Sequence, residues 1–131
     1  MSEATPPRPT DAELAILQVL WERGPSTVRE VHEVLSQGAP GTGYTTVLKL
    51  MQIMTEKGLV RRDESQRAHV YTPRVTQQKT QRQLVTDLLN KAFGGSPTRL
   101  AMQALATKKA SAEELEELRE LLDTLQEEEE S

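Results

Sequence analysis

The sequence predicts a mainly α-helical protein with one small β-hairpin. Apolar residues recur at spacings of three and four in six segments, which is the period of a helix that buries one face. Three of these segments open with the Ser/Thr-x-x-Glu pattern of a capping box, in which a hydroxyl and a carboxylate each bind a free backbone amide. Between the third and fourth segments, two short runs of β-forming residues break the helical period, which predicts a pair of strands.

Length and composition exclude several classes of protein. The 131 residues suit one domain, or a small domain with an appended module. The chain has no cysteine, which excludes disulfide scaffolds, thiolate metal sites and cysteine nucleophiles. No apolar run approaches the roughly 20 residues that span a bilayer, and residues 1–10 lack the basic-then-apolar layout of a signal peptide. We therefore expect a cytoplasmic protein with no membrane partner.

Each helix has an identifiable start, and four have an identifiable end. A hydroxyl-bearing cap or the end of the glycine-rich loop 38–43 predicts helices that open at Thr10, Thr27, Tyr44, Thr76, Ser96 and Ser111. Glycine or proline ends the first four, at Gly24-Pro25, Gly38, Gly58 and Gly94-Gly95. Residues 1–9 contain three prolines and are predicted to be a flexible leader.

The two β-leaning runs are Leu59–Asp63 and Ala68–Thr72, and Pro73 ends the second. They predict a hairpin with strands of about five residues and a basic tip. Three helices followed by a hairpin is the element order of a winged helix-turn-helix, in which the third helix enters the DNA major groove and the hairpin, or wing, flanks it. We therefore predict a winged-helix DNA-binding domain over residues 10–75, a three-helix dimerisation region over residues 76–126 and a solvated acidic tail over residues 127–131.

Charge is distributed unevenly along the chain, although the total is only −4. Residues 42–83 hold eight Lys and Arg against three Asp and Glu, whereas residues 1–41 and 84–131 are both net acidic. Local potential steers a polyanion, so the third helix and the hairpin are the predicted nucleic-acid interface. Its candidate DNA-binding residues are Tyr44, Thr45, Thr46, Lys49, Gln52, Arg67 and His69.

These residue types have chemical reasons to contact DNA. Hydroxyls near a helix N-terminus bind phosphate oxygens, threonine methyl groups contact thymine, and Gln52 is suited to adenine. A wing arginine such as Arg67 reaches a phosphate or the minor groove. The alternatives are that Tyr44-Thr45-Thr46 only caps a helix, and that the hairpin charges only protect an edge strand.

The sequence carries no pattern of a catalytic or metal site. His32 and His69 lie in different elements, with no carboxylate or cysteine at metal-ligand spacing. The glycine-rich loop lacks the Lys-Ser/Thr of a phosphate-binding loop, and no nucleophile elbow is present. We therefore predict that the chain is not an enzyme and has no cofactor and no metal site.

The C-terminal segments predict an interface between helices. The last predicted helix carries a narrow leucine seam at 3-4-3 spacing, formed by Leu115, Leu118, Leu122 and Leu125. Such a seam suits pairing with a second helix. We predict a homodimer that presents two recognition helices about 34–36 Å apart to a palindromic operator. The alternatives are a helical hairpin within one chain, and a protein-interaction module whose seam binds a partner helix without any DNA. The predicted dimerisation residues are Leu84, Leu88, Phe93, Leu100, Leu105, Leu115, Leu118, Leu122 and Leu125.

Several segments together resemble the penicillinase repressor family of BlaI/MecI-type transcriptional regulators. They cover the chain from about Thr10 to Gln126 and read LAILQVLWE, TVREVHEVL, YTTVLK, EKGLVR, RAHVYTP, FGGS and EELEELRELL. The resemblance implies a homodimeric winged-helix repressor of transcription. It places Tyr44, Thr45 and Thr46 at the start of the recognition helix, with Lys49 on its groove face and Arg67 in the wing.

The chain also departs from the family pattern. In well-studied relatives, a membrane sensor of β-lactams triggers proteolysis at an Asn-Phe bond, and this chain has Gln103-Ala104 near that position. The resemblance implies a sensor protease as a partner. The absence of the Asn-Phe pair at Gln103-Ala104 argues against this partner. Copper-responsive members use a C-terminal cysteine motif, which this chain lacks. Gln52 and Ile53 stand where the family often has Asn and Arg, so a different operator preference is expected.

Overall fold

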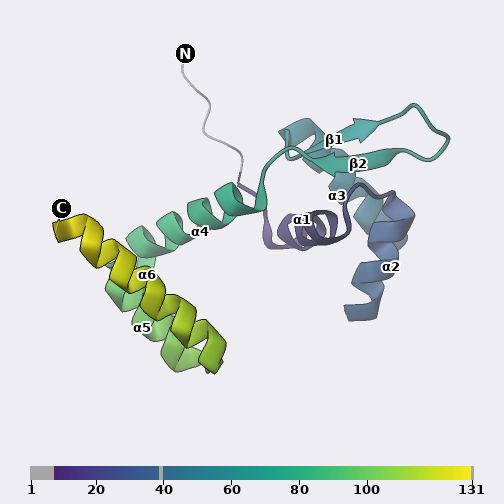
Figure 1. Cartoon of the computed structure of the whole chain (residues 1–131). Helices are drawn as coiled ribbons and strands as arrows, with labels where there is room; N and C mark the ends of the chain where they lie inside the picture. Colours follow the sequence, from purple (N-terminus) through teal and green to yellow (C-terminus); the bar gives the residue numbers. More distant parts are fainter. Residues whose placement is uncertain (1–7, 39, 131) are drawn as a thin grey trace, which may run out of the picture. The chain divides into compact units, whose positions relative to one another are not determined.

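The computed structural model describes residues 8–38 and 40–130. Six helices and a two-stranded sheet follow one another in the predicted order (Figure 1). Residues 1–7 of the predicted leader, residue 39 of the glycine-rich loop and the last residue of the predicted tail lie outside the described ranges. The elements are α1 Asp11–Arg23, α2 Val28–Gly38, α3 Tyr44–Lys57, β1 Val60–Asp63, β2 Val70–Pro73, α4 Gln77–Ala92, α5 Pro97–Thr107 and α6 Ala112–Glu130.

The chain divides into two compact units on either side of the Leu84–Val85 peptide bond, which lies within α4. The functional domains expected over residues 10–75 and 76–126 stay predictions. Over the described ranges, no helix combines the length and the apolarity needed to cross a membrane.

The N-terminal unit has one hydrophobic core, formed by α1, α2, α3 and the hairpin. Because α1 contacts α2, α3 and β2, it buries Ile16, Leu17, Val19 and Leu20. A helix that is covered on several sides has a wider apolar face than the stripe that periodicity detects. The buried apolar residues are Ile16, Leu17, Val19, Leu20, Val28, Val31, Val47, Met51, Met54, Leu59, Val60 and Tyr71.

Capping boxes start α1, α2 and α6, which confirms the prediction from the sequence. In α1, the Thr10 amide donates to Glu13 Oε1 at 2.9 Å and the Glu13 amide donates to Thr10 Oγ1 at 3.2 Å. The same reciprocal bonds join the pairs Thr27 with Glu30 and Ser111 with Glu114.

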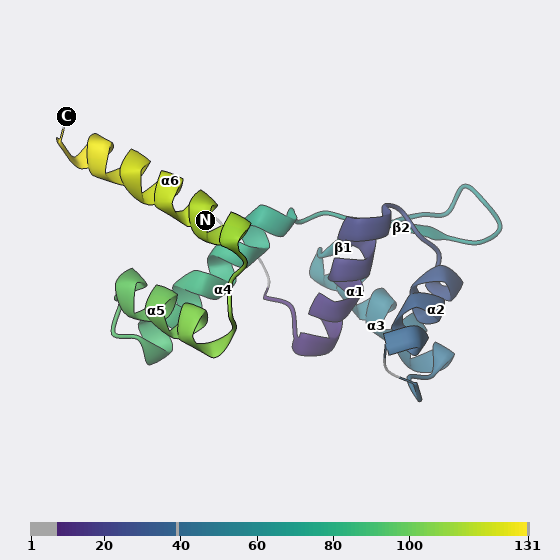
Figure 2. The same ribbon diagram turned by 60° about the horizontal axis from the view of Figure 1, so that its bottom comes forward.

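The hairpin is shorter than predicted. Its strands pair antiparallel with Val60 opposite Pro73, and each has four residues. Leu59 lies outside β1 because its amide donates to the Met54 carbonyl at 2.9 Å and so belongs to the end of α3. β2 starts at Val70, two residues later than predicted, and it includes Pro73, because the last residue of an edge strand does not need the amide that proline lacks. The joining loop extends past both strands (Figures 1 and 2).

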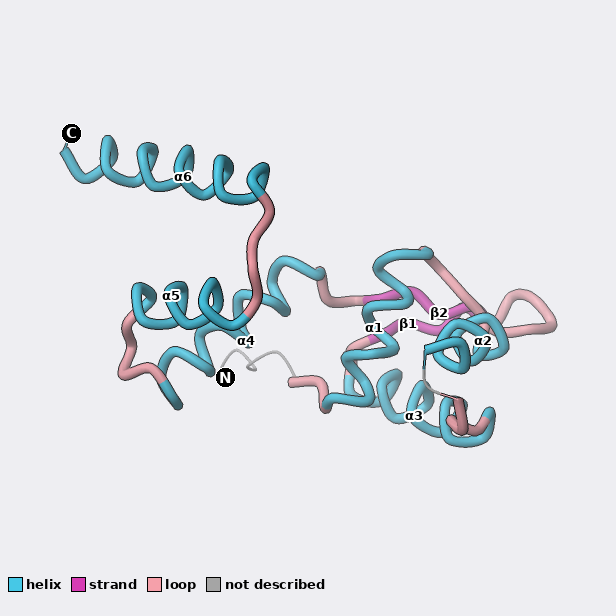
Figure 3. Tube along the Cα trace, turned by 90° about the horizontal axis from the view of Figure 1, so that it is seen from below, coloured by secondary structure: helices cyan, strands magenta, loops and turns pink. Residues whose placement is uncertain are grey.

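The C-terminal unit contains the end of α4, α5 and α6. Gly94 and Gly95 separate α4 from α5, and the Ser96 hydroxyl caps α5 by accepting from the Arg99 amide at 3.1 Å. Residues 127–130 of the predicted solvated acidic tail are exposed and continue α6, because glutamate favours helix and no glycine or proline interrupts it. α6 stands apart from α5 (Figure 3), and neither helix has a buried residue.

Candidate nucleic-acid interface

The predicted contact residues of the third helix all lie on the exposed side of α3. Val47, Met51 and Met54 are fully buried in the core, so helical geometry turns the opposite face outward. Lys49 and Gln52 are exposed on this outward side. The helix therefore presents hydroxyl, ammonium and amide groups together, from the exposed residues Tyr44, Thr45, Thr46, Lys49 and Gln52.

The start of α3 is suited to an anion. The N-cap is Gly43, which has no side chain to accept a hydrogen bond from the first-turn amides. These amides and the positive end of the helix dipole favour a phosphate oxygen. Because Gly43 is the N-cap, Tyr44-Thr45-Thr46 form the first helical turn, and the alternative that they only cap the helix does not hold.

A hollow of about 540 Å³ joins three elements of the N-terminal unit. The start of α2, the start of α3 and the wing loop form its walls. It brings together three of the predicted contact residues, Tyr44, Arg67 and His69, whereas the other four lie on α3 outside it. Its lining is Thr27, Val28, Arg29, Tyr44, Leu48, Arg67, Ala68, His69 and Tyr71.

Two exposed residues near this surface are not among the predicted contact residues, although Ile53 is one of the departures from the family pattern. Arg29 lines the hollow from α2, although the sequence places it in a net acidic segment. The sequence did carry one signal for Arg29. It lies two residues after Thr27, which opens the helix, so its cationic side chain adds to the positive end of the helix dipole. Ile53, which is 37% exposed, follows Gln52 on α3 and adds an apolar group there.

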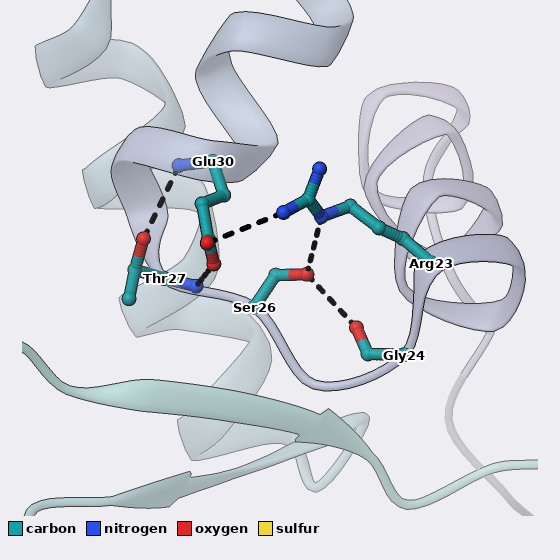
Figure 4. A network of polar contacts seen from close by, with 5 residues as sticks. All are labelled: Arg23, Gly24, Ser26, Thr27 and Glu30. Carbon is teal, nitrogen blue, oxygen red and sulfur yellow. Dashed lines mark hydrogen bonds and ion pairs between the residues drawn. The ribbon is translucent and has the colours of Figure 1, made fainter.

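Polar contacts hold the walls of the hollow together (Figure 4). Arg23 Nε donates to Ser26 Oγ at 3.1 Å, and the Ser26 hydroxyl donates to the Gly24 carbonyl at 2.8 Å. The backbone of the buried Ser26 forms two hydrogen bonds with that of Tyr71 in β2, at 3.1 and 2.8 Å. The turn between α1 and α2 is thereby attached to the wing, and residues of both the start of α2 and the wing line the hollow.

The ion pairs of the N-terminal unit leave the interface positive. The Thr27 amide, together with Arg23, lowers the pKa of Glu30, so this carboxylate is ionised and pairs with Arg23 at 3.2 Å. Lys57 and Arg62 also have acidic partners, Glu13 and Glu64 respectively. Within residues 8–38 and 40–130, no ion pair involves the three cations of the candidate interface, Arg29, Lys49 and Arg67.

Six of the nine predicted dimerisation residues are exposed in the single chain. Leu88, Leu105 and all four α6 leucines of the seam are exposed, whereas Leu84, Phe93 and Leu100 are half-buried. Three further exposed apolar side chains were not selected from the sequence, Val85, Met102 and Leu121. Because the α6 leucines are exposed within one chain, the alternative of a helical hairpin that buries them is not supported.

The remaining sequence predictions concern cleavage and metal binding. Gln103 and Ala104 lie inside α5 with exposed side chains, and a protease partner stays a prediction. Among the residues that the structure describes, no three His, Cys, Asp or Glu side chains are grouped so as to hold a metal ion.

Comparison with known proteins agrees with this geometry. The chain is 35% identical over 117 residues to the transcriptional regulator BlaI of Mycobacterium tuberculosis (strain ATCC 25618 / H37Rv), which covers 88% of this chain and 83% of that protein. It is 28% identical over 120 residues to the penicillinase repressor of Bacillus licheniformis, which covers 89% of this chain and 91% of that protein. These relatives are regulators, which confirms the prediction that the chain is not an enzyme.

The fold comparison concerns a DNA-binding domain. The solution structure of the DNA-binding domain of the repressor BlaI matches 57% of this chain and 90% of that domain, with a TM-score of 0.50 and 25% identity. The model of the penicillinase repressor family matches residues 9–124, nearly the whole chain. The chain therefore belongs to the penicillinase repressor family of winged-helix transcriptional regulators.

Proposed function

We propose that this chain represses transcription as a homodimer that binds a palindromic operator through α3 and the wing. The observation that carries the proposal is the hollow at the start of α3, which Tyr44 and His69 line together with the two arginines Arg29 and Arg67. The solved BlaI domain, which has the same fold, is a DNA-binding domain. A dimer bound to its operator represses transcription by excluding polymerase from the same DNA. On this proposal the protein acts in the cytoplasm of a bacterium.

The dimensions of α3 support insertion into the major groove. Its 14 residues extend roughly 21 Å at 1.5 Å per residue, and a major groove about 12 Å wide admits one helix. On this proposal the Thr45 and Thr46 methyl groups and Gln52 face base edges, and Arg29 neutralises a phosphate. Lys49 and Arg67 contact either a phosphate or a base. Phosphate contacts fix the position of the protein on the duplex, and base contacts give the sequence preference.

The second copy of the proposed dimer covers the apolar face of the C-terminal helices. Leu118 is 36% exposed and Leu122 is 63% exposed, and neither has a partner element in the described part of the chain that buries it. Leucines at this spacing pair with the same face of another helix, because each side chain then fills a gap between its counterparts. Two copies held in this way bind two half-sites related by the same symmetry.

Selection from random duplexes tests the proposal. The full-length chain is incubated with a random-sequence DNA pool, and bound duplexes are recovered and amplified over several rounds. We expect enrichment of an inverted repeat whose half-sites lie about one helical turn apart. A chain that enriches no sequence is not a sequence-specific repressor, and the protein-interaction alternative then applies. Enrichment of a single, unrepeated site contradicts the homodimer.

A further inference from the structure

His32 makes contacts that no step above uses. It lies on α2, half-buried, outside the hollow. Its Nε2 is 2.9 Å from the Thr42 carbonyl oxygen, and because a carbonyl only accepts, Nε2 carries the hydrogen and donates it. The hydroxyl of Ser36, one helical turn further along α2, lies 3.2 Å from the same nitrogen. The imidazole is therefore oriented from its own helix and bonded to the backbone just before α3.

The same imidazole contacts the first residue of α3. The ring centroids of His32 and Tyr44 are 5.8 Å apart and the rings are inclined by 80°, an edge-to-face arrangement that aromatic pairs favour. Tyr44 lines the hollow and is 46% exposed on its other side. One side chain of α2 thus contacts the chain on both sides of Gly43.

The chain needs such a contact at this point. The turn before α3 contains Gly41, with φ +106°, and Gly43, so its backbone has more conformational freedom than one made of other residues. Gly43 supplies no side-chain cap that would fix the first helical turn. The bond from His32 to Thr42 and the ring contact with Tyr44 restrain this turn and the start of α3 from α2.

We propose that His32 is a positioning residue for operator recognition, a conclusion that rests on the DNA-binding function proposed above. It holds the first turn of α3 so that Tyr44, Thr45 and Thr46 meet the DNA in one fixed orientation, without touching the DNA itself. Base contacts require that orientation, whereas the general attraction between cations and phosphates does not. His32 therefore raises the affinity for the operator more than the affinity for other DNA.

The test compares His32→Leu and His32→Gln with the unaltered chain. Binding isotherms are recorded on the duplex enriched by the unaltered chain and on a shuffled duplex of the same composition. We expect His32→Leu to bind the enriched duplex roughly tenfold more weakly and the shuffled duplex equally well. The salt dependence stays unchanged because no cation is removed. His32→Gln places an amide donor near the position of Nε2, and it should recover most of the lost affinity.

The ratio of the two affinities separates positioning from a loss of stability. Partial unfolding removes active protein and weakens binding to both duplexes equally, so it leaves the ratio unchanged. The folded fraction of each variant is checked by the fluorescence of Trp21, the only tryptophan. Glu33→Gln, at the next and exposed position on α2, serves as the matched control.

Three results would overturn the inference. If the unaltered chain prefers its enriched duplex and His32→Leu keeps the same ratio, His32 has no positioning role, while the proposed function stands. If His32→Gln is as poor as His32→Leu, the hydrogen bond to Thr42 is not the cause. If the unaltered chain discriminates between no duplexes at all, the proposed function itself fails and this inference fails with it.

Discussion

Glu13 is a buried carboxylate that ties the start of α1 to the end of α3. It is 2% exposed, and Lys57 Nζ and the Thr10 amide both reach its Oε1, at 2.7 and 2.9 Å. Burial raises the pKa of Glu13, but the hydrogen bond and charge of Lys57 and the bonds from Thr10 together lower it below its ordinary value of 4.5. The ionised form is therefore the one that the folded unit stabilises.

The direction of this shift predicts how stability depends on pH. Because the folded pKa is lower than the unfolded one, Glu13 contributes stability above the unfolded pKa and loses it as pH falls through the folded pKa. We expect Glu13→Gln to lower the free energy of unfolding at neutral pH by about 2 kcal/mol. The same substitution should also reduce the further fall in the free energy of unfolding as the pH is lowered.

Urea unfolding, followed by Trp21 fluorescence at neutral and acidic pH, measures both effects. Glu22→Gln, at an exposed position of the same helix, is the control and should behave like the unaltered chain. An acid dependence that is as steep in Glu13→Gln as in the unaltered chain would show that other carboxylates are responsible.

Lys49 and Arg67 each have two candidate roles on DNA, a phosphate contact or a base contact. The two roles have different measurable effects. Both residues are exposed and outside the ion pairs seen in the described ranges. A side chain that contacts a phosphate lowers the slope of log K against log salt by about 0.9 when it is removed. A side chain that reads a base costs about 1–3 kcal/mol at one position of the site when it is removed.

We therefore expect Lys49→Ala and Arg67→Ala each to weaken operator binding by one of these two routes. Isotherms at several salt concentrations, on the enriched duplex and on point variants of it, distinguish the routes. Lys109→Ala removes the same charge from an exposed position of the C-terminal unit and should leave binding unchanged. Unchanged isotherms for both Lys49→Ala and Arg67→Ala would remove these residues from the interface.

At the scale of elements, Gly58 decides how α3 passes into the wing. Its φ of 84° is left-handed, and its amide donates to the carbonyls of Met54 and Thr55 at the end of the helix. A Cβ at this position meets no atom within 4 Å, so any effect of alanine comes from the backbone conformation alone.

Gly58→Ala is expected to lower the free energy of unfolding by about 1–2 kcal/mol. Gly38→Ala is the matched control, because a Cβ there also meets no atom within 4 Å and the φ of Gly38 is not positive. The control should be neutral or stabilise slightly, since alanine reduces the freedom of the unfolded chain. Equal stabilities of the two variants in thermal unfolding would contradict the role given to the left-handed turn.

The elements themselves were mostly predictable, because their signals are local. Capping boxes involve residues three apart, and Gly58 follows its helix directly, so both were recognisable in the sequence. The ends of the hairpin were not predictable in the same way, because the sequence around Leu59 fits both the end of α3 and the start of β1. The hydrogen bond from the Leu59 amide to the Met54 carbonyl assigns Leu59 to the end of α3. This hydrogen bond depends on the left-handed conformation of Gly58.

At the scale of the whole molecule, the exposed leucines of α6 predict association. We expect Leu118→Asp combined with Leu122→Asp to sediment as a monomer, because two carboxylates on the seam oppose burial against a second copy. Operator affinity should fall by at least about 100-fold, since the gain from binding two linked half-sites is lost. Analytical ultracentrifugation and binding isotherms on the enriched duplex measure the two effects.

Thr124→Asp is the matched control for this prediction. It adds a carboxylate to an exposed position on another side of α6, and it should leave both the mass and the binding unchanged. A double Leu118 and Leu122 variant that still sediments as a dimer would place the interface on other residues.

The sequence by itself determined the order of the elements, most helix starts and the exposed face of α3, because these depend on periodicity and on neighbours within one helical turn. The tertiary structure decided which distant residues meet. Arg29 joins Arg67 and His69 at the hollow because the backbone of Ser26 bonds to that of Tyr71, and His32 reaches the start of α3 across the turn that precedes it. Such contacts arise from packing between segments that are far apart in the chain, and local patterns carry no record of that packing.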